Sequence, residues 1–291
     1  MHTHHSIFDI LIHSVEESLF LLPYLFITYL FLEFLEKKTE RVSLFFSKTN
    51  SCFAPVLAAL SGILPQCGLG VAGANLFAAR VISVGTLIAL FLATSDEMLP
   101  ILLSNGVPAR TIMLILFYKT SIAIFIGLTV DMVLKRKNKG KTPSFQMHTL
   151  CHQASCGCHQ KSLWVSALNH TSQIFIFILV INMVLNILFL FVHPTHLKEI
   201  LLNHALIAPL FGTLFGLIPN CATSVISAQL FAEKTLSDGA FLSAILANAG
   251  VGLLVLLRVN RPLKQSLKII FFIFLIALLS GLIFSSLGLS F

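Results

Sequence analysis

The sequence predicts an all-α integral membrane protein built from two inverted-topology repeats of about five helical segments each. Three observations lead to this prediction: the composition, an internal repeat and the distribution of basic residues. Hydrophobic residues make up 56% of the 291 positions and charged residues only 11%, and the mean hydropathy is +0.92. Soluble domains carry about 25% charged residues. We therefore expect most of the chain to lie in lipid.

Apolar segments alternate with short polar loops along the whole chain. A helix needs about 20 residues to cross about 30 Å of hydrocarbon. Three segments are much shorter, and we expect either short crossings or half-helices that enter the membrane and return. The first segment has no basic n-region and no small-residue cleavage site, so it is expected to be a helix and not a removable signal peptide. The ten segments cover residues 7–35, 52–64, 69–80, 82–103, 111–134, 166–193, 199–218, 222–233, 238–257 and 265–289.

An internal repeat relates the two halves of the chain. A shift of 154 residues aligns residues 61–97 with 215–251 and gives 12 identical pairs among 37. A repeat of this length indicates duplication of a whole structural unit. The predicted domains are therefore a first membrane repeat, a basic Cys/His-rich linker and a second membrane repeat, at residues 1–134, 135–165 and 166–291.

The orientation of the halves follows from the number of crossings. Each half crosses an odd number of times whether its short segments span or re-enter, and an odd number inverts the second half relative to the first. Lys and Arg gather in cytoplasmic loops, and 14 of the 19 fall in three loops that this threading places on one face. We expect a multi-pass protein of a bacterial-type plasma (inner) membrane, with both termini outside and three cytoplasmic regions at 36–50, 135–165 and 258–264.

Two proline motifs occupy corresponding positions in the repeat. Proline breaks a helix and frees carbonyl groups, which persist in a membrane only where protein or water covers them. An amide and a thiol follow each break, at Gln66-Cys67 and at Asn220-Cys221. A single such motif is usually a kink beside a structural cysteine. Its duplication at corresponding positions favours a binding site at the membrane midplane.

A second pair of polar breaks follows at Thr94-Ser95-Asp96-Glu97 and Asn248-Ala249-Gly250. Adjacent acids in an apolar stretch need water or a cation nearby, and a solvated loop toward the outer side is the open alternative for Asp96 and Glu97. The candidate metal ligands are Cys67, Cys221 and Asp96. The full set of substrate-binding candidates is Gln66, Cys67, Asn75, Thr94, Ser95, Asp96, Asn220, Cys221, Ser224, Gln229 and Asn248.

Several ionisable residues are candidates for coupling transport to an ion gradient. Asp9, His13 and Glu17 recur every four residues and share one helical face. They could relay protons, collect divalent cations, or cap a helix end in the interface. Glu97 and Lys119 complete the coupling set, and Lys119 could equally pair with an acid for structure, because an intramembrane lysine requires a partner.

The linker contains a weaker candidate metal site, formed by Cys151, His152, Cys156, Cys158 and His159. Thiolate and imidazole ligands suit soft or borderline ions and do not suit manganese or magnesium. The spacing fits no closed zinc module, so we expect a flexible metal-collecting loop, or a chance cluster in a disordered linker. The six cysteines do not form a disulfide framework.

Longer motifs around these breaks resemble those of one protein family. They are Gly62-x-x-Pro65-Gln66-Cys67-Gly68, Gly85-Thr86-Leu87-Ile88-Ala89, Thr94-Ser95-Asp96-Glu97-Met98-Leu99-Pro100 and Ile218-Pro219-Asn220-Cys221-Ala222-x-Ser224-Val225. This pattern is similar to the ten-helix heavy-metal exporter family, whose members carry the labels manganese transporter and arsenic efflux protein. The resemblance spans the whole chain, although Gly70 stands where Ser is expected and His13 replaces an acid. It implies metal efflux.

These observations predict a secondary active transporter that exports a divalent or heavy-metal ion, manganese or similar, by alternating access. No Gly-x-x-x-x-Gly-Lys-Ser/Thr phosphate loop is present, so proton or ion coupling is expected and an intrinsic ATPase is not. The expected partners are the lipid bilayer and the transported ion, without nucleic acid or a resident cofactor. The alternative is a permease for an organic or arsenic-containing solute. A membrane enzyme with a catalytic cysteine near His170 is a third reading, but no thiol–imidazole–carboxylate set is recognisable.

Overall fold

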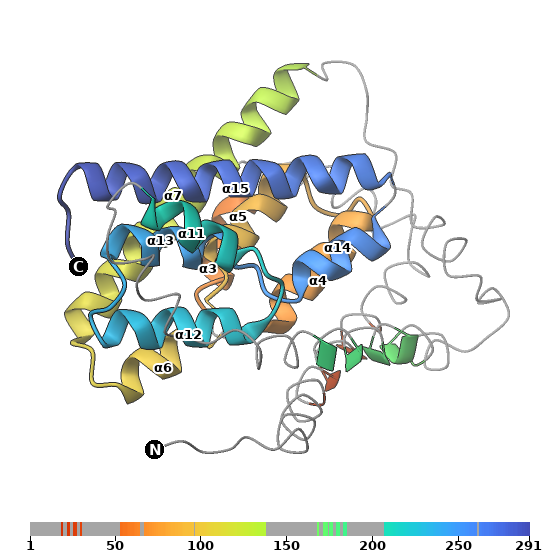
Figure 1. The fold of residues 1–291 in the computed structure, drawn as a ribbon. Coiled ribbons are helices and arrows are strands. Elements are labelled where there is room, and N and C mark those ends of the chain that lie inside the picture. The colour runs from red at the N-terminus through yellow and green to blue at the C-terminus, as the bar shows by residue number, and fades with distance from the viewer. Residues whose placement is uncertain are drawn as a thin grey trace, which may run out of the picture.

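The computed structural model describes most of both predicted repeats and little of the remaining chain. Every secondary-structure element in the described part is a helix (Figure 1). Four helical stretches there are long and apolar enough to cross a membrane: Val84–Ser104, Ala109–Leu134, Asp238–Val259 and Leu263–Ser286. The described part of the chain is therefore all-helical, and the chain is a multi-pass membrane protein, as predicted. The described residues are 53–64, 67–95, 97–137, 207–260 and 262–291, with 19, 22, 23, 26, 27, 30, 168, 171–173, 175, 176, 179, 180, 183 and 184.

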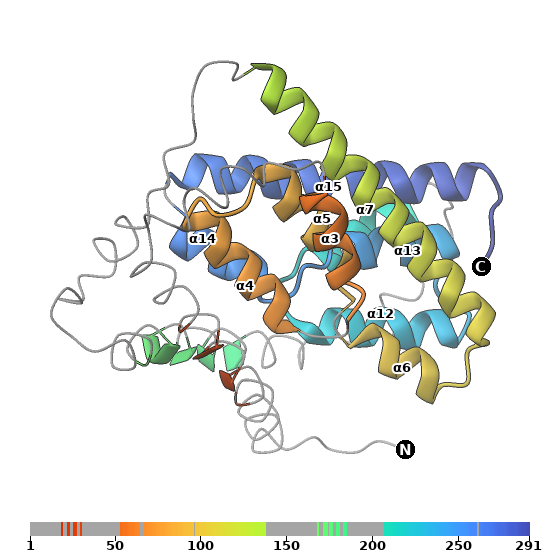
Figure 2. The ribbon, with the colours of Figure 1, turned by 180° about the vertical axis from the view of Figure 1, so that it is seen from behind.

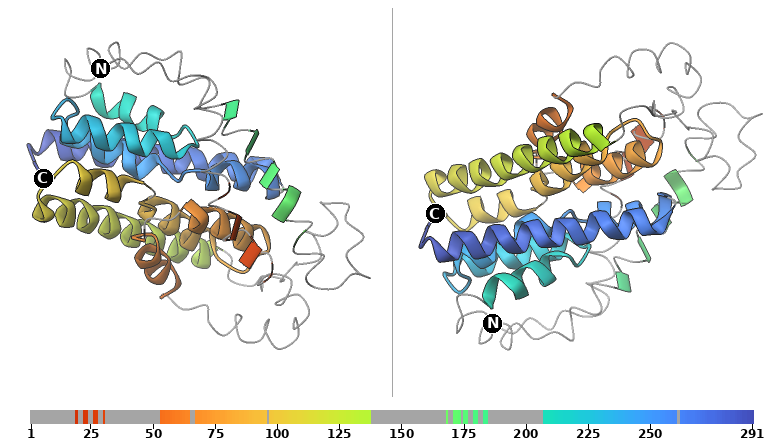
Figure 3. Two further views of the ribbon diagram at one scale, coloured as in Figure 1. Left: turned by 90° about the horizontal axis from the view of Figure 1, so that it is seen from below. Right: turned by 90° about the horizontal axis from the view of Figure 1, so that it is seen from above.

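The helices form two series with matching starts. Each helix of the second series begins 154 residues after its counterpart, as in 67 and 221 or 109 and 263. The two series lie in two layers in both views of Figure 3. The first series is α3 (Ala54–Ser61), α4 (Cys67–Ala78), α5 (Val84–Ala93), α6 (Met98–Ser104) and α7 (Ala109–Lys137). The second is α11 (Ala208–Gly216), α12 (Cys221–Ala232), α13 (Asp238–Ala247), α14 (Gly252–Val259) and α15 (Leu263–Ser286).

Matching local signals end and begin these helices. Arg80 and Lys234, just after α4 and α12, both have positive φ, at 60° and 56°, a conformation uncommon for residues other than glycine. Ser83 and Ser237 then cap α5 and α13, where each hydroxyl accepts from the backbone N–H three residues on, at 3.1 and 3.4 Å. The two halves thus share their turn chemistry as well as their helix starts.

Two kinds of interruption divide the apolar segments. Thr94 and Asn248 leave the helical conformation, with ψ of 126° and 102°, and end α5 and α13 about half-way along their apolar stretches. Pro219 lies in the turn between α11 and α12, whereas Pro65 lies outside the described residues. With 12 residues each, α4 and α12 reach only about 18 Å, which is too short to cross the hydrocarbon alone.

Small residues hold each half together. In the first half α3, α5 and α7 pack against one another, and in the second α11, α13 and α15 do so. A Cβ added to Gly127 would lie 2.9 Å from the carbonyl oxygen of Gly85, and one added to Gly281 would lie 2.6 Å from that of Gly239. Backbones therefore approach directly at corresponding crossings, as small residues allow in membrane bundles.

The two halves pack against each other through their short helices. Helix α4 packs against α14, and α12 packs against α6 (Figure 2). At the first of these contacts a Cβ added to Gly252 would lie 2.8 Å from the carbonyl carbon of Gly70. The break between α13 and α14 is thereby covered by α4.

Replacing Gly252 with alanine is expected to destabilise the protein by about 1–3 kcal/mol, because the new methyl group has no space against a rigid backbone. Thermal unfolding of the purified protein measures this. Gly70→Ala is the matched control with a milder effect, since its Cβ would meet the Ala249 carbonyl oxygen at 3.2 Å. A Gly252→Ala variant as stable as wild type would contradict this packing.

The ends of α15 show how the helices are directed. Helix α15 begins beside the loop between α4 and α5, where Arg80 donates a hydrogen bond to Gln265 at 3.3 Å. It ends beside the start of α13, where Gly239 lies against Gly281. Consequently α5 and α13 begin at opposite ends of α15.

Candidate functional site

Buried polar side chains lie at the helix breaks. Thr94, Ser95, Asn220, Ser224 and Asn248 are each at most 4% exposed. All five were predicted substrate-binding residues. Burial of a polar group is unfavourable unless it is hydrogen-bonded, and each of these side chains takes part in a hydrogen bond to a nearby backbone group.

The break between α5 and α6 is stabilised by a lysine from α7. The hydroxyl of Thr94 donates to the carbonyl of Leu90 at 2.7 Å, and the carbonyl of Thr94 itself accepts a hydrogen bond from Lys119 Nζ. Lys119 is only 2% exposed, which is rare for a lysine. The corresponding position in the second half is Ile273, so this cationic group belongs to one break only.

The break between α13 and α14 is closed by its own side chain. Asn248 Oδ1 accepts from the backbone N–H of Gly250 at 2.8 Å, and Gly250 has a φ of 53°. This conformation favours glycine. The two breaks therefore have the same position and burial but different electrostatics.

The turn before α12 presents a thiol and a hydroxyl on one buried face. Asn220 caps the helix, with its Oδ1 accepting from the backbone N–H of Ala222 at 3.3 Å. Cys221 forms no disulfide and is buried, at 3% exposed. One turn later, Ser224 Oγ donates to the carbonyl of Cys221 at 2.8 Å. Sulfur ligands of this kind suit soft metal ions.

One predicted pair of amides is found in unlike surroundings. Asn75 is fully buried in α4, and its side-chain amide donates to the carbonyl of Val71 at 3.1 Å. Gln229, at the corresponding position of α12, is exposed. The structure therefore does not bring Gln229 into the buried polar set.

A sequence model of one family matches residues 7–196, about two thirds of the 291 residues, and the family is described as "Putative, 10TM heavy-metal exporter". The chain belongs to this family. The resemblance inferred from the proline and acidic motifs is thereby confirmed. Searches of curated proteins and of solved structures returned no match. The membership makes the chain a membrane protein of a metal-exporter family and not of an enzyme family.

Many of the predicted binding, coupling and metal-site residues lie outside the described residues. They are Asp9, His13, Glu17, Gln66, Asp96, Cys151, His152, Cys156, Cys158 and His159, and for Cys67 only the backbone is described. Glu97 is exposed and precedes α6 as its N-cap residue. Within the described part of the chain, no three His, Cys, Asp or Glu side chains lie close enough together to hold a metal.

One buried and one half-buried group were not singled out as site residues from the sequence. Ser227 was interpreted only as a small packing residue, yet it is 3% exposed and lies three residues after Ser224 on the same face of α12. Asp131 accepts hydrogen bonds from the Ser83 hydroxyl at 2.6 Å and the Gly85 N–H at 2.9 Å, which fixes the start of α5 against α7. The three-residue spacing of Ser224 and Ser227 was the sequence signal that could have identified Ser227.

Proposed function

We propose that this chain is a secondary active transporter that exports a divalent or heavy-metal ion by alternating access between two inverted halves. The observation that carries the proposal is the paired interruption of apolar spans, at Thr94 and Asn248, by buried polar residues. Broken helices of this kind form ion and substrate sites in transporters, because unwound backbone is tolerated only where it lines a cavity or is covered by protein.

The directions of the helices support the inverted arrangement. Helices α5 and α13 begin at opposite ends of α15, beside Gln265 and Gly281 respectively. Two corresponding helices of a duplicated unit therefore point in opposite directions. We infer that the units 1–134 and 166–291 are related by an axis in the membrane plane, with the linker 135–165 between them.

The basic residues support one orientation in the membrane. Arg80, Arg258 and Lys264 lie toward the end where α15 begins, together with the basic end of α7, whose Asp131 contacts the start of α5. The opposite end has Lys234 beside the loop that precedes α7. By the positive-inside rule, the first end is cytoplasmic. Both termini are then outside, and loops 36–50 and 258–264 are inside.

In the proposed mechanism, the two broken spans and the short helices that cover them form a midplane ion site. The ligands would come from Gln66, Cys67, Asp96, Asn220, Cys221 and Ser224, because a dehydrated cation in a low-dielectric medium needs close oxygen or sulfur donors. When no ion is bound, the ammonium group of Lys119 would remain hydrogen-bonded to the Thr94 carbonyl. The remaining coupling candidates, Asp9, His13, Glu17 and Glu97, would exchange protons as the halves rearrange.

A second candidate is a permease for an organic or arsenic-containing solute. The observation that favours it is the chemistry of the described breaks, whose buried side chains are hydroxyls, amides and a thiol besides the lysine. Such donors form a poor cage for a hard dication such as manganese. They suit a soft metal or a metalloid bound through sulfur.

Loss of the gene is expected to raise the intracellular content of one metal by several-fold, because efflux would cease while uptake continues. Elemental analysis of cells grown with a panel including manganese, zinc and arsenite measures this. Re-expression of the wild-type chain should restore the original content. Unchanged content of every metal in the panel would contradict the proposal.

A further inference from the structure

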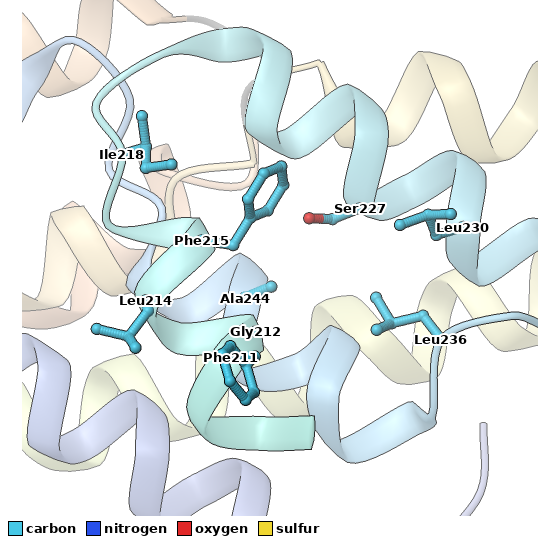
Figure 4. A pocket seen from close by; sticks show the side chains of 9 residues that line it. All are labelled: Phe211, Gly212, Leu214, Phe215, Ile218, Ser227, Leu230, Leu236 and Ala244. Carbon is cyan, nitrogen blue, oxygen red and sulfur yellow. The ribbon is translucent and has the colours of Figure 1, made fainter. Parts of the chain in front are cut away.

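A partly open cavity of about 240 Å³ lies in the second half, between α11, α12 and α13 (Figure 4). Its wall is almost entirely apolar, with aromatic rings from α11 and aliphatic side chains from the other elements. Among the described residues that line it, Ser227 supplies the one polar side chain. The lining residues include Phe211, Leu214, Phe215, Ile218, Ser227 and Ala244.

The Ser227 hydroxyl is directed into this cavity (Figure 4). The residue is 3% exposed, and its hydroxyl has no hydrogen-bond partner within the described parts of the chain. A buried hydroxyl without a partner is unfavourable. A hydrogen-bonding ligand in the cavity would remove this cost.

The corresponding place in the first half is filled. Leu90 stands where the second half has Ala244, and Gly73 where it has Ser227. The side chain of Leu90 lies directly against Gly73, so that no Cβ fits there. The two halves therefore differ at two positions that face each other. Ala244 leaves the space and Ser227 supplies the hydroxyl in the second half.

We propose that this cavity binds a small uncharged amphiphile, a cyclic or bicyclic hydrocarbon with one hydrogen-bonding group held by Ser227. The volume is somewhat larger than that of an engineered cavity of about 150 Å³ that accepts benzene. An ion is disfavoured, because the described residues of the wall carry no charge to offset its desolvation. Entry is from the lipid side, where Phe211 and Leu214 are 40% and 49% exposed.

A molecule bound in the cavity would contact the turn between α11 and α12. Ile218 lines the cavity, and its carbonyl accepts from the backbone N–H of Asn220 at 2.8 Å. A bound molecule would hold this turn, with Cys221, in the conformation seen. The resulting inhibition of transport rests on the proposed function, whereas the binding itself does not.

Binding is tested with the full chain in lipid nanodiscs, with 2-naphthol and naphthalene as probes. We expect saturable binding with 2-naphthol about fivefold tighter than naphthalene, the effect of one net hydrogen bond. Ser227→Ala should remove this preference while both probes still bind. Leu214→Trp should weaken both by at least about tenfold, because the indole occupies the mouth of a close-packed cavity.

Leu60→Trp is the matched control, since Leu60 is the counterpart of Leu214 in the first half and both are 49% exposed. It should bind both probes as wild type does. Non-saturable partitioning alone would overturn the proposal and indicate that a lipid acyl chain fills the cavity. Equal weakening by both tryptophan variants, or a naphthol preference retained in Ser227→Ala, would also overturn it. None of these results depends on whether the chain transports metal.

Discussion

Replacing Lys119 with methionine is expected to lower the rate of metal efflux by about a hundredfold. Methionine keeps the length and apolar character of the side chain but removes the ammonium group that donates to the Thr94 carbonyl. That carbonyl would remain buried at a helix break without this donor, at a cost of about 1–3 kcal/mol. The helix break at Thr94 would then rearrange. Both the positive charge beside the break and the geometry of the break would be lost.

Ile273→Met is the control for this change, because Ile273 occupies the corresponding position of the second half and is also fully buried. It should transport nearly as wild type does. Lys119→Arg keeps the charge and should retain part of the activity. Efflux is compared at equal amounts of folded protein in the membrane. Equal efflux by Lys119→Met and Ile273→Met would show that the lysine has a packing role only.

The double change Cys67→Ser and Cys221→Ser is expected to reduce transport of a soft ion by at least about tenfold. Cys221 is buried in the first turn of α12, where the Ser224 hydroxyl donates to its carbonyl. Serine keeps a similar size and a hydrogen-bonding group but loses the polarisable sulfur. Efflux of zinc, cadmium and arsenite from cells expressing each variant measures the effect.

Cys52→Ser tests for a general effect of removing a thiol, since Cys52 lies outside both proline motifs. It should leave efflux unchanged. Indifference of transport to the double change would exclude sulfur ligation and indicate oxygen ligands or another substrate. A loss confined to arsenite would favour the permease alternative over the metal-ion exporter.

Much of the helical framework could be predicted from the sequence, because local signals determine it. Ser83 and Ser237 mark helix starts through their capping hydroxyls, and Thr94 and Asn248 mark helix ends through an interrupted apolar pattern. The exchanged packing of α4 on α14 could not be predicted. It depends on the close approach of Gly70 and Gly252, which are 182 residues apart (252 − 70) and share no periodic pattern.

The candidate site could be predicted only in part. Asn220, Cys221 and Asn248 are buried at breaks as their positions in the repeat suggested. The unlike environments of Asn75 and Gln229 were not foreseen, because sequence correspondence does not determine which face of a helix packs against a neighbour. The Thr94 carbonyl to which Lys119 donates lies 25 residues away, and a contact between two helices leaves no local signal.

The most direct test of the account is ion-resolved transport by the purified chain in proteoliposomes with an imposed proton gradient. We expect movement of a heavy-metal ion that depends on the gradient, needs no nucleotide and is lost in Lys119→Met but not in Ile273→Met. Absence of gradient-driven movement for every metal tested, from a correctly folded wild-type chain, would contradict it.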